Sequence, residues 1–244
     1  MILKKWDELP SEFHKETVRY YYDCLAKKKV SLLCKRIFDI VAASVLLLLL
    51  SPLFLVLAVA IKLDSNGPVF YRQERVTAYG KRFRIFKFRT MVSDADQKGT
   101  LLTRKNDMRI TRIGKLIRRG RLDEIPQLLN VFTGEMSFVG TRPEVPKYVR
   151  YYSDEMLATL LLPAGITSEA CIRFKDEDEL LADAVDIDRQ YAEMVLPLKM
   201  KHNLKAIEQF SFWVEIATMF RTVFAVLGKD YSEKDAVVAE ITNV

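Results

Sequence analysis

Two adjacent acidic residues, Asp123 and Glu124, lie in a strongly basic part of the chain. The arginines that bracket them are Arg112, Arg118, Arg119, Arg121 and Arg142. Carboxylates can attack phosphorus or hold a metal ion, and guanidinium groups bind phosphoryl oxygens, so this combination indicates phosphate chemistry. A simpler interpretation stays open, because the acids precede or begin a helix opened by Pro126, and Asp is a common helix N-cap.

The segments on both sides of the acids bring positive charge toward them. Adjacent residues on a helix do not share a face, so one acid can be a nucleophile while the other holds a metal. The preceding segment, 109–121, is predicted to be a basic amphipathic helix. Its apolar residues recur at helical spacing: Ile110, Ile113, Leu116 and Ile117. After the acids, a loop at 136–144 framed by glycine and proline adds Arg142.

A predicted β-hairpin supplies further positive charge. Its strands span 69–76 and 83–90, and a turn at 77–80 separates them. The basic residues of the second strand include Arg84, Lys87 and Arg89. Such a strand can be a solvated edge protected against aggregation. Because many positive charges gather here beside an apolar run, phosphate binding is at least as good an interpretation.

The apolar run at 40–61 contains no charged residue and is long enough to cross a hydrocarbon core as a helix. Ser51-Pro52 lies near its middle. Proline removes a backbone donor and its ring conflicts with the carbonyl four residues earlier, at Leu48. We therefore predict a helix, a break and a second helix, with the Ser51 hydroxyl helping to satisfy the interrupted backbone.

Basic residues flank both ends of this run, and they mark the cytoplasmic side of a membrane. A re-entrant hairpin that keeps both ends on one side is therefore favoured over a straight span, which stays open. A buried core helix is a weaker alternative, since such a helix rarely stays uncharged on every face. Arg36 and Asp39, at the start of the run, are expected to pair across one helical turn.

The composition limits the other classes of protein. The 244 residues allow one ordinary domain beside a membrane element. The net charge of +6 suits anionic lipids and phosphate-bearing substrates, and no nucleic-acid-binding motif is present. Three cysteines and two histidines argue against a disulfide framework, a zinc site or histidine-based catalysis. We expect no cleavable signal peptide, because the apolar run starts late.

Several motifs in order resemble the bacterial sugar transferase family, the monotopic phosphoglycosyl transferases. They are 35–39 (KRIFD), Ser51-Pro52, 67–73 (GPVFYRQ), 87–91 (KFRTM), 122–131 (LDEIPQLLNV) and 136–144 (MSFVGTRPE). The resemblance runs from about Lys35 to Thr167, and so many motifs in sequence are specific where one alone is not. The chain departs from the family at Thr77, at Thr141 and over 168–175, where Arg173 or Lys175 would have to replace an expected arginine.

The resemblance implies an enzyme that moves a sugar 1-phosphate from a UDP-sugar to polyprenyl (undecaprenyl) phosphate, at the start of surface-glycan assembly. Asp123 would attack the sugar-proximal phosphate and expel UMP. Mg²⁺, held by Asp123 and Glu124, would neutralise the diphosphate. The residues expected to bind substrate phosphates are Lys87, Arg89, Arg112, Arg118 and Arg142. Of these, Lys87 and Arg89 are assigned to the acceptor phosphate.

The implied partners are a UDP-sugar, polyprenyl phosphate and the lipid bilayer; a homodimer stays open, and no nucleic acid is expected. The implied location is the bacterial inner membrane, with the catalytic domain facing the cytoplasm. Two alternatives remain. One is a membrane-tethered Mg²⁺-dependent hydrolase of nucleotide diphosphates, and the other is a non-catalytic scaffold that binds anionic lipids.

The expected fold is α+β and mainly helical. We divide the chain into an N-terminal interfacial helix (1–34), a re-entrant membrane hairpin (35–64), a cytoplasmic catalytic domain (65–230) and a tail (231–244). The first helix carries Tyr20-Tyr21-Tyr22, which lie either at headgroup level or on an ordinary amphipathic helix. Other expectations are helices at 91–98, 144–162 and 191–227 and a solvated acidic face at 175–188. The apolar stripe of 191–227 suits either the interface or the core.

Overall fold

The computed structural model describes residues 3–93, 95, 107–174 and 186–227. Its α-helices are α1 (Glu16–Ala26), α2 (Lys29–Leu49), α3 (Ser51–Asp64), α4 (Arg112–Arg119), α5 (Gln127–Thr133), α6 (Pro146–Val149), α7 (Glu169–Arg173), α9 (Ile187–Gln190), α10 (Leu196–Glu208) and α11 (Phe212–Val226). Its strands are β1 (Phe70–Val76), β2 (Arg82–Phe88), β3 (Met136–Val139) and β4 (Ala164–Thr167). Short 3-10 helices lie at Trp6–Glu8, Ser11–Phe13, Ala78–Gly80, Leu122–Glu124 and Met156–Leu161, with a π-helical turn at Tyr191–Val195. The prediction of a mainly helical α+β fold is confirmed.

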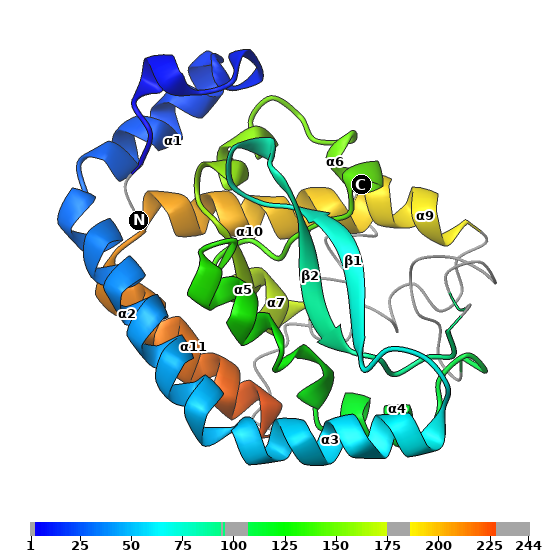
Figure 1. The fold of residues 1–244 in the computed structure, drawn as a ribbon. Helices are drawn as coiled ribbons and strands as arrows, with labels where there is room; N and C mark the ends of the chain where they lie inside the picture. The colour runs from blue at the N-terminus through cyan, green and yellow to red at the C-terminus, as the bar shows by residue number, and fades with distance from the viewer. Residues whose placement is uncertain (1–2, 94, 96–106, 175–185, 228–244) are drawn as a thin grey trace.

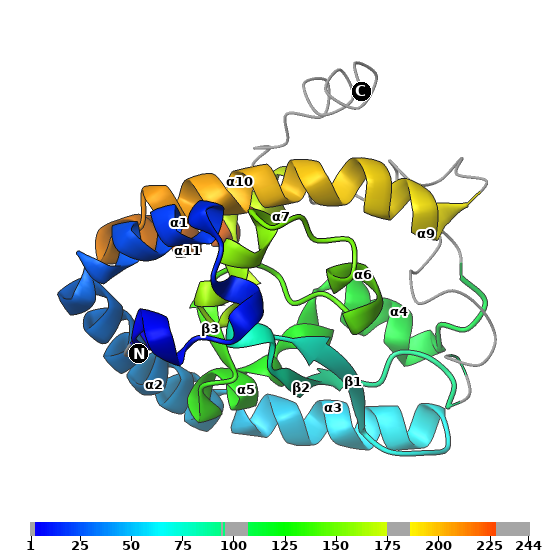
Figure 2. The ribbon, with the colours of Figure 1, turned by 90° about the horizontal axis from the view of Figure 1, so that it is seen from above.

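Strands β1 and β2 form the predicted antiparallel hairpin, which stands near the centre of Figure 1. In Figure 2, α3 and α10 lie on opposite sides of it. The buried Asn130 of α5 covers the second edge of β2. Its Oδ1 accepts from the Phe86 amide at 2.9 Å, and its Nδ2 donates to the Arg84 carbonyl at 3.1 Å. Asn130 thus fixes α5, and the acids just before it, against the strand that carries Lys87.

A second sheet corrects the prediction of a loop over 136–144. The first four residues of this segment form β3, which pairs in parallel with β4. Both strands are short and almost fully buried, so they lack the alternating pattern that marks a half-exposed strand. The two backbone segments approach closely at Gly140, directly after β3. A Cβ on Gly165 of β4 would lie 2.2 Å from the Gly140 nitrogen. This contact sets the path of the chain that leads to Arg142.

The predicted break at Ser51-Pro52 is confirmed, because α2 and α3 meet there at an angle of 60°. Figure 1 shows them along the outside of the molecule. The Ser51 hydroxyl donates to the Leu48 carbonyl at 2.8 Å. Pro52 cannot donate to this carbonyl, because proline has no backbone N–H. No single helix among the described residues has the length and apolar character to cross a membrane. The bent pair of α2 and α3 together meets those criteria.

The expected ion pair between Arg36 and Asp39 is wrong. Asp39 is buried and accepts hydrogen bonds from the Ser137 hydroxyl at 2.8 Å and the Phe138 amide at 3.2 Å. Arg36 instead donates to two carbonyls at the C-terminal end of α5, at 2.7 and 2.9 Å. A cation is favourable there because the last carbonyls of a helix lack partners. Contacts with distant elements therefore replace the local pair.

The N-terminal helix α1 packs against α10 and the 3-10 helix Met156–Leu161. Tyr21 and Leu25 are buried in this contact, and the Tyr21 hydroxyl donates to Glu155 at 2.7 Å. Tyr20 remains 57% exposed. Tyr21 therefore has the core position of an ordinary amphipathic helix rather than a headgroup position.

The predicted helical segment 191–227 is confirmed but interrupted. The chain leaves α10 near the buried Phe210 and restarts as α11, which lies beside α2 in Figure 1. The apolar stripe of α11 divides between two environments, since Met219 packs against the core and Phe220 is 63% exposed. The tail at 231–244, most of the acidic face at 175–188 and half of the predicted short helix at 91–98 lie outside the described residues.

Candidate active site

Asp123 and Glu124 lie on the 3-10 helix Leu122–Glu124, between α4 and α5. Arg121 adopts a left-handed conformation with φ 51°, which turns the chain sharply after α4. Leu122 packs against the apolar cluster between α3, α4 and β2. The acids therefore precede α5, as predicted, and sit on a turn that is anchored in the core.

The two carboxyl groups face different pockets. Asp123 lines a polar pocket of about 460 Å³ beside the hairpin. Glu124 lines a mainly apolar pocket of about 350 Å³, whose walls come from α2, α5, β4, α7 and α11. Neighbours on a helical turn point in different directions, so the backbone itself separates them. The geometry is consistent with a different role for each acid.

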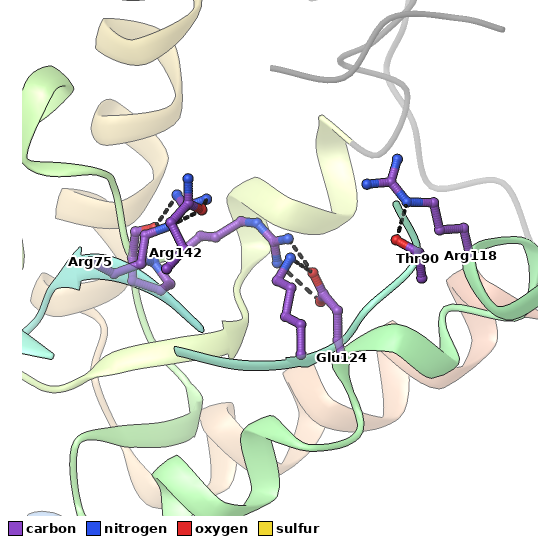
Figure 3. Close-up of polar contacts among 8 residues, drawn as sticks. Arg75, Thr90, Arg118, Glu124 and Arg142 are labelled. Atoms are coloured by element: carbon purple, nitrogen blue, oxygen red, sulfur yellow. Dashed lines mark hydrogen bonds and ion pairs between the residues drawn. The ribbon is translucent and has the colours of Figure 1, made fainter. Parts of the chain in front are cut away.

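Glu124 is held by two cations, as Figure 3 shows. Lys87 Nζ donates to its Oε1 at 2.8 Å. The Arg142 guanidinium donates to both oxygens, reaching Oε2 at 3.2 Å. Burial raises the pKa of Glu124, but the charges of Arg142 and Lys87 outweigh burial and hold this pKa well below its ordinary value. Glu124 is therefore ionised, and with its two partners it forms the wall between the pockets.

Asp123 has a different electrostatic environment. Burial raises the pKa of its carboxyl group, and the neighbouring Glu124 adds to this effect. Lys87 and Arg118 act in the opposite direction but do not cancel it. Because Glu124 is committed to two ion pairs, Asp123 is the better candidate for a nucleophile.

Positive charge from β1, β2 and α4 lines the polar pocket. Its cationic residues are Arg72, Arg75, Lys87, Arg89, Arg109 and Arg118. Hydrogen bonds orient two of them: Arg118 Nε donates to the Thr90 hydroxyl at 2.9 Å, and Arg75 donates to the Pro143 carbonyl at 2.9 Å. Figure 3 shows Arg118 and Arg75 on either side of Glu124. A pocket of this kind suits a ligand with several negative charges, such as a diphosphate.

The structure brings most of the predicted phosphate-binding residues to the acids. Lys87 and Arg118 line the polar pocket with Asp123, and Arg142 lines the apolar pocket with Glu124. Arg89 is buried in the wall of the polar pocket and donates to the C-cap residue of α3 at 2.6 Å. Arg112 is exposed on α4 and lines neither pocket, so the fold does not bring it into this site.

Sequence reasoning did not single out Arg75 or Arg109. Arg75 shares a face of β1 with residues 71 and 73, so the two-residue period of the strand is the signal that points to it. Arg173, considered as a replacement for a family arginine, pairs instead with Glu169 at 3.2 Å and lines neither pocket. Lys175, the other candidate, lies outside the described residues.

A metal would find few protein ligands here. Within the described ranges, no group of three or more Asp, Glu, His or Cys side chains could form a metal site. Mg²⁺ commonly takes one or two carboxylates and completes its shell with substrate phosphates and water. Asp123 fits that pattern, whereas Glu124 is engaged by Lys87 and Arg142. The donor set therefore suits a metal ion that binds together with a phosphate ligand.

Comparison with known proteins adds an independent finding. Residues 30–229 match the family model described as bacterial sugar transferase. A UDP-N-acetylgalactosamine-undecaprenyl-phosphate N-acetylgalactosaminephosphotransferase from Aeromonas hydrophila is 37% identical over 196 residues, 79% of this chain and 43% of the relative. A UDP-glucose:undecaprenyl-phosphate glucose-1-phosphate transferase from Caulobacter vibrioides is 36% identical over 199 residues, 80% of this chain and 70% of the relative.

A third relative is the exopolysaccharide production protein ExoY from Rhizobium meliloti. It is 34% identical over 216 residues, 82% of this chain and 88% of the relative. The chain thus spans less than half the length of the Aeromonas protein but most of the Rhizobium one. The family match contains the bent helix pair, the hairpin and both acids. Because it covers residues 30–229 of 244, the chain belongs to the bacterial sugar transferase family.

Proposed function

We propose that this chain transfers a sugar 1-phosphate from a UDP-sugar to undecaprenyl phosphate. The observation that carries the proposal is the position of Asp123 in a cation-lined pocket, next to an ion-paired Glu124. Family membership supports it, and the names of the Aeromonas and Caulobacter relatives describe this class of reaction.

The reaction has two steps at one phosphorus atom. In the first, a carboxylate oxygen of Asp123 attacks the phosphorus next to the sugar. The bond from this phosphorus to the bridging oxygen of the diphosphate breaks, and its electron pair leaves with UMP. In the second, an oxygen of undecaprenyl phosphate attacks the same phosphorus and releases Asp123 as a free carboxylate. The product is an undecaprenyl diphosphate sugar.

The positive charges of the polar pocket make the first step feasible. A carboxylate and a diphosphate repel each other, and Arg75 and Arg118 offset this repulsion while holding phosphoryl oxygens. Lys87 donates a hydrogen bond to Glu124 and lines the same pocket as Asp123, whose pKa its charge lowers. Glu124 acts by positioning Lys87 and Arg142 rather than by attacking.

Mg²⁺ is part of the proposal. Asp123 would hold it together with diphosphate oxygens, and Glu124 would add a second carboxylate only if its ion pairs with Lys87 and Arg142 opened. When bound, the ion would neutralise the diphosphate and the leaving group. Addition of a chelator is therefore expected to stop turnover, and addition of Mg²⁺ is expected to restore it.

We further propose that the protein lies on the cytoplasmic face of the bacterial inner membrane, with α2 and α3 as a re-entrant hairpin. Basic residues on both flanks support one common side for the two ends. Apolar side chains near the bend are exposed in the absence of lipid: Leu48 is 75%, Leu49 67% and Leu55 68% exposed. Such a patch suits contact with lipid chains.

The test is UMP release by the full chain in detergent, with Mg²⁺, a panel of UDP-sugars, and undecaprenyl phosphate present or absent. We expect turnover that depends on the lipid and is lost in Asp123→Asn. Asp23→Asn, which changes a partly exposed aspartate of α1, is the matched control and should keep full activity. UMP release without the lipid would instead favour a hydrolase, and full activity of a folded Asp123→Asn variant would exclude the proposed nucleophile.

A further inference from the structure

The apolar pocket on the Glu124 side of the wall has no role in the chemistry described so far. Its walls come from elements that are distant in the chain, including the end of α2, the start of α5, β4 and α11. Most of its lining is aliphatic or aromatic: Leu46, Leu50, Leu128, Phe138, Ile166 and Val226. Its volume of about 350 Å³ lies in the range of pockets that bind small ligands.

The lining of this pocket also carries charge. Arg121, Glu124 and Arg142 are among its lining residues, so two guanidinium groups accompany a single carboxylate. The ion pair with Glu124 holds Arg142 in place, and Arg121 lies at a left-handed turn directly after α4. A pocket with apolar walls and a net positive charge among its lining residues matches a ligand that has an apolar chain and an anionic head.

Other lining residues of the pocket adjoin exposed apolar surface. Leu50 lies at the 60° bend between α2 and α3, directly after Leu48 and Leu49, which are 75% and 67% exposed. On α11, Val226 is followed by Leu227, which is 76% exposed. A chain longer than the pocket can therefore continue over apolar side chains instead of entering water.

We infer that this pocket binds the phosphate-proximal part of the isoprenoid chain of the acceptor, with the acceptor phosphate beside Arg121 and Arg142. The inference rests on the proposed function and adds a route for each substrate. The nucleotide sugar reaches Asp123 from the polar pocket. The acceptor phosphate reaches the phosphorus on Asp123 from the apolar pocket, across the ion pairs of Glu124 with Lys87 and Arg142, which open for the second step. The two substrates therefore need not share an entrance.

A bulky side chain in the apolar pocket tests this route. Ala225 lines the pocket on α11, whereas Val223 on the same helix does not line it and is 55% exposed. We expect Ala225→Trp to raise the KM for undecaprenyl phosphate roughly tenfold or more, since displacing even two methylene groups from an apolar site has that effect. The KM for the UDP-sugar should stay within about twofold, and Val223→Trp should resemble the parent chain.

An unchanged KM for the lipid in a folded Ala225→Trp variant would overturn the inference, as would equal increases in both variants. A second measurement does not depend on turnover. A photoreactive undecaprenyl phosphate analogue, bound to the full chain in phospholipid nanodiscs, should label peptides that contain Leu46–Leu50 or Ile166–Ile172. Labelling confined to the polar pocket, or abolished by excess phospholipid but not by excess undecaprenyl phosphate, would count against it.

These measurements separate the inference from the proposed function. If the parent chain releases no UMP from any donor, the proposed transfer fails, whereas specific labelling of the apolar pocket would still show a polyprenyl phosphate site. If the parent chain turns over but the Ala225→Trp variant binds lipid normally, the transfer stands and this route is wrong.

Discussion

At the scale of single residues, Asp123 and Glu124 are neighbours in the chain but have opposite surroundings. Burial opposes ionisation of both. For Glu124, direct ion pairs with Lys87 and Arg142 outweigh burial and lower the pKa. For Asp123, the cations are less effective, and the pKa rises. A difference of this kind divides a carboxylate pair into an ionised positioning group and a group available for chemistry.

The raised pKa of Asp123 predicts the pH dependence of the reaction. A nucleophilic carboxylate must be deprotonated, so kcat/KM should fall as the pH drops through this pKa, which lies above the ordinary value of 3.8. Lys87 lowers the pKa of Asp123, so Lys87→Met should move the acidic limb of the pH profile to higher pH.

The measurement is kcat/KM for the UDP-sugar across the acidic and neutral range. Lys81→Met, at an exposed lysine of the same hairpin, is the control. A limb that stays in place or moves to lower pH would contradict this assignment.

Replacing Glu124 with glutamine tests the ion-paired wall. Removal of one partner from a fully buried pair costs about 3–5 kcal/mol. Since Lys87 and Arg142 are 20% and 36% exposed, we expect roughly 2 kcal/mol for Glu124→Gln. The depressed pKa of Glu124 means that its stabilisation is present above the ordinary pKa of a glutamate and is lost as the pH falls through the folded-state value.

The measurement for this variant is the free energy of unfolding in detergent as a function of pH. The difference between the parent chain and Glu124→Gln should shrink on acidification. Glu74→Gln removes an exposed pair with Arg82 and should cost less than about 1 kcal/mol. A Glu124→Gln variant as stable as the parent chain near neutral pH would show that the wall does not depend on these charges.

At the scale of elements, α2 attaches to the rest of the fold through buried polar contacts. Lys35 donates to the Val139 carbonyl at 2.7 Å and pairs with Glu215 of α11. Asp39 accepts from two donors at the Ser137-Phe138 segment of β3. The motif at 35–39 therefore joins the bent helix pair to β3 and α11, the elements that form the walls around the acids.

Asp39→Ala should destabilise the fold strongly. It leaves the Ser137 hydroxyl and the Phe138 amide without their acceptor and removes a negative charge close to Lys35. Loss of one member of a buried charged network costs about 3–5 kcal/mol. Asp39→Asn keeps one acceptor oxygen and should cost less than Asp39→Ala. Thermal unfolding in detergent would measure both, with Asp23→Ala at a partly exposed site as the control. Equal stability of the two Asp39 variants would show that the hydrogen bonds at this residue contribute little.

At the scale of the whole molecule, the bend between α2 and α3 borders the pocket that Glu124 lines. Leu46 and Leu50, just before and at the bend, line the same pocket as Glu124. In the proposed transfer, the lipid phosphate would stay at the interface while its chain stays in the bilayer, and the nucleotide sugar would come from water. A hairpin that enters and leaves the membrane on one side would therefore hold the acids where both substrates can meet.

Cysteine labelling tests this orientation. Cys34 is exposed before the bend, and Leu63 is 84% exposed after it. In a chain with Cys24→Ser and Cys171→Ser, a thiol reagent that does not cross membranes should reach Cys34 in inside-out vesicles. In a second chain that carries Leu63→Cys and also lacks Cys34, the same reagent should reach the new cysteine from the same side. Protection of both sites in right-side-out vesicles is the control. Labelling of the two positions from opposite sides would establish a straight span.

The sequence by itself determined the features that local rules control. Proline at residue 52 interrupts any helix, so the break followed from one residue type. The two-residue period and the turn at 77–80 defined the hairpin, and the apolar residues at helical spacing indicated α4. The acidic pair and most of its arginines were found because their types and clustering indicate phosphate chemistry before any fold is known.

Only the tertiary structure decided which distant groups meet. The pairing of β3 with β4 joins segments buried on both faces, which show no period. Asp39 accepts hydrogen bonds from β3 instead of pairing with Arg36. Arg112 lines neither pocket, whereas Arg75 lines the pocket of Asp123. Thr77, where the family often has glycine, donates to the Glu135 carbonyl at 2.6 Å and accepts from the Ala164 amide at 3.1 Å. These choices depend on distances between residues far apart in the chain, because burial makes each polar group take whichever partner the packed core provides.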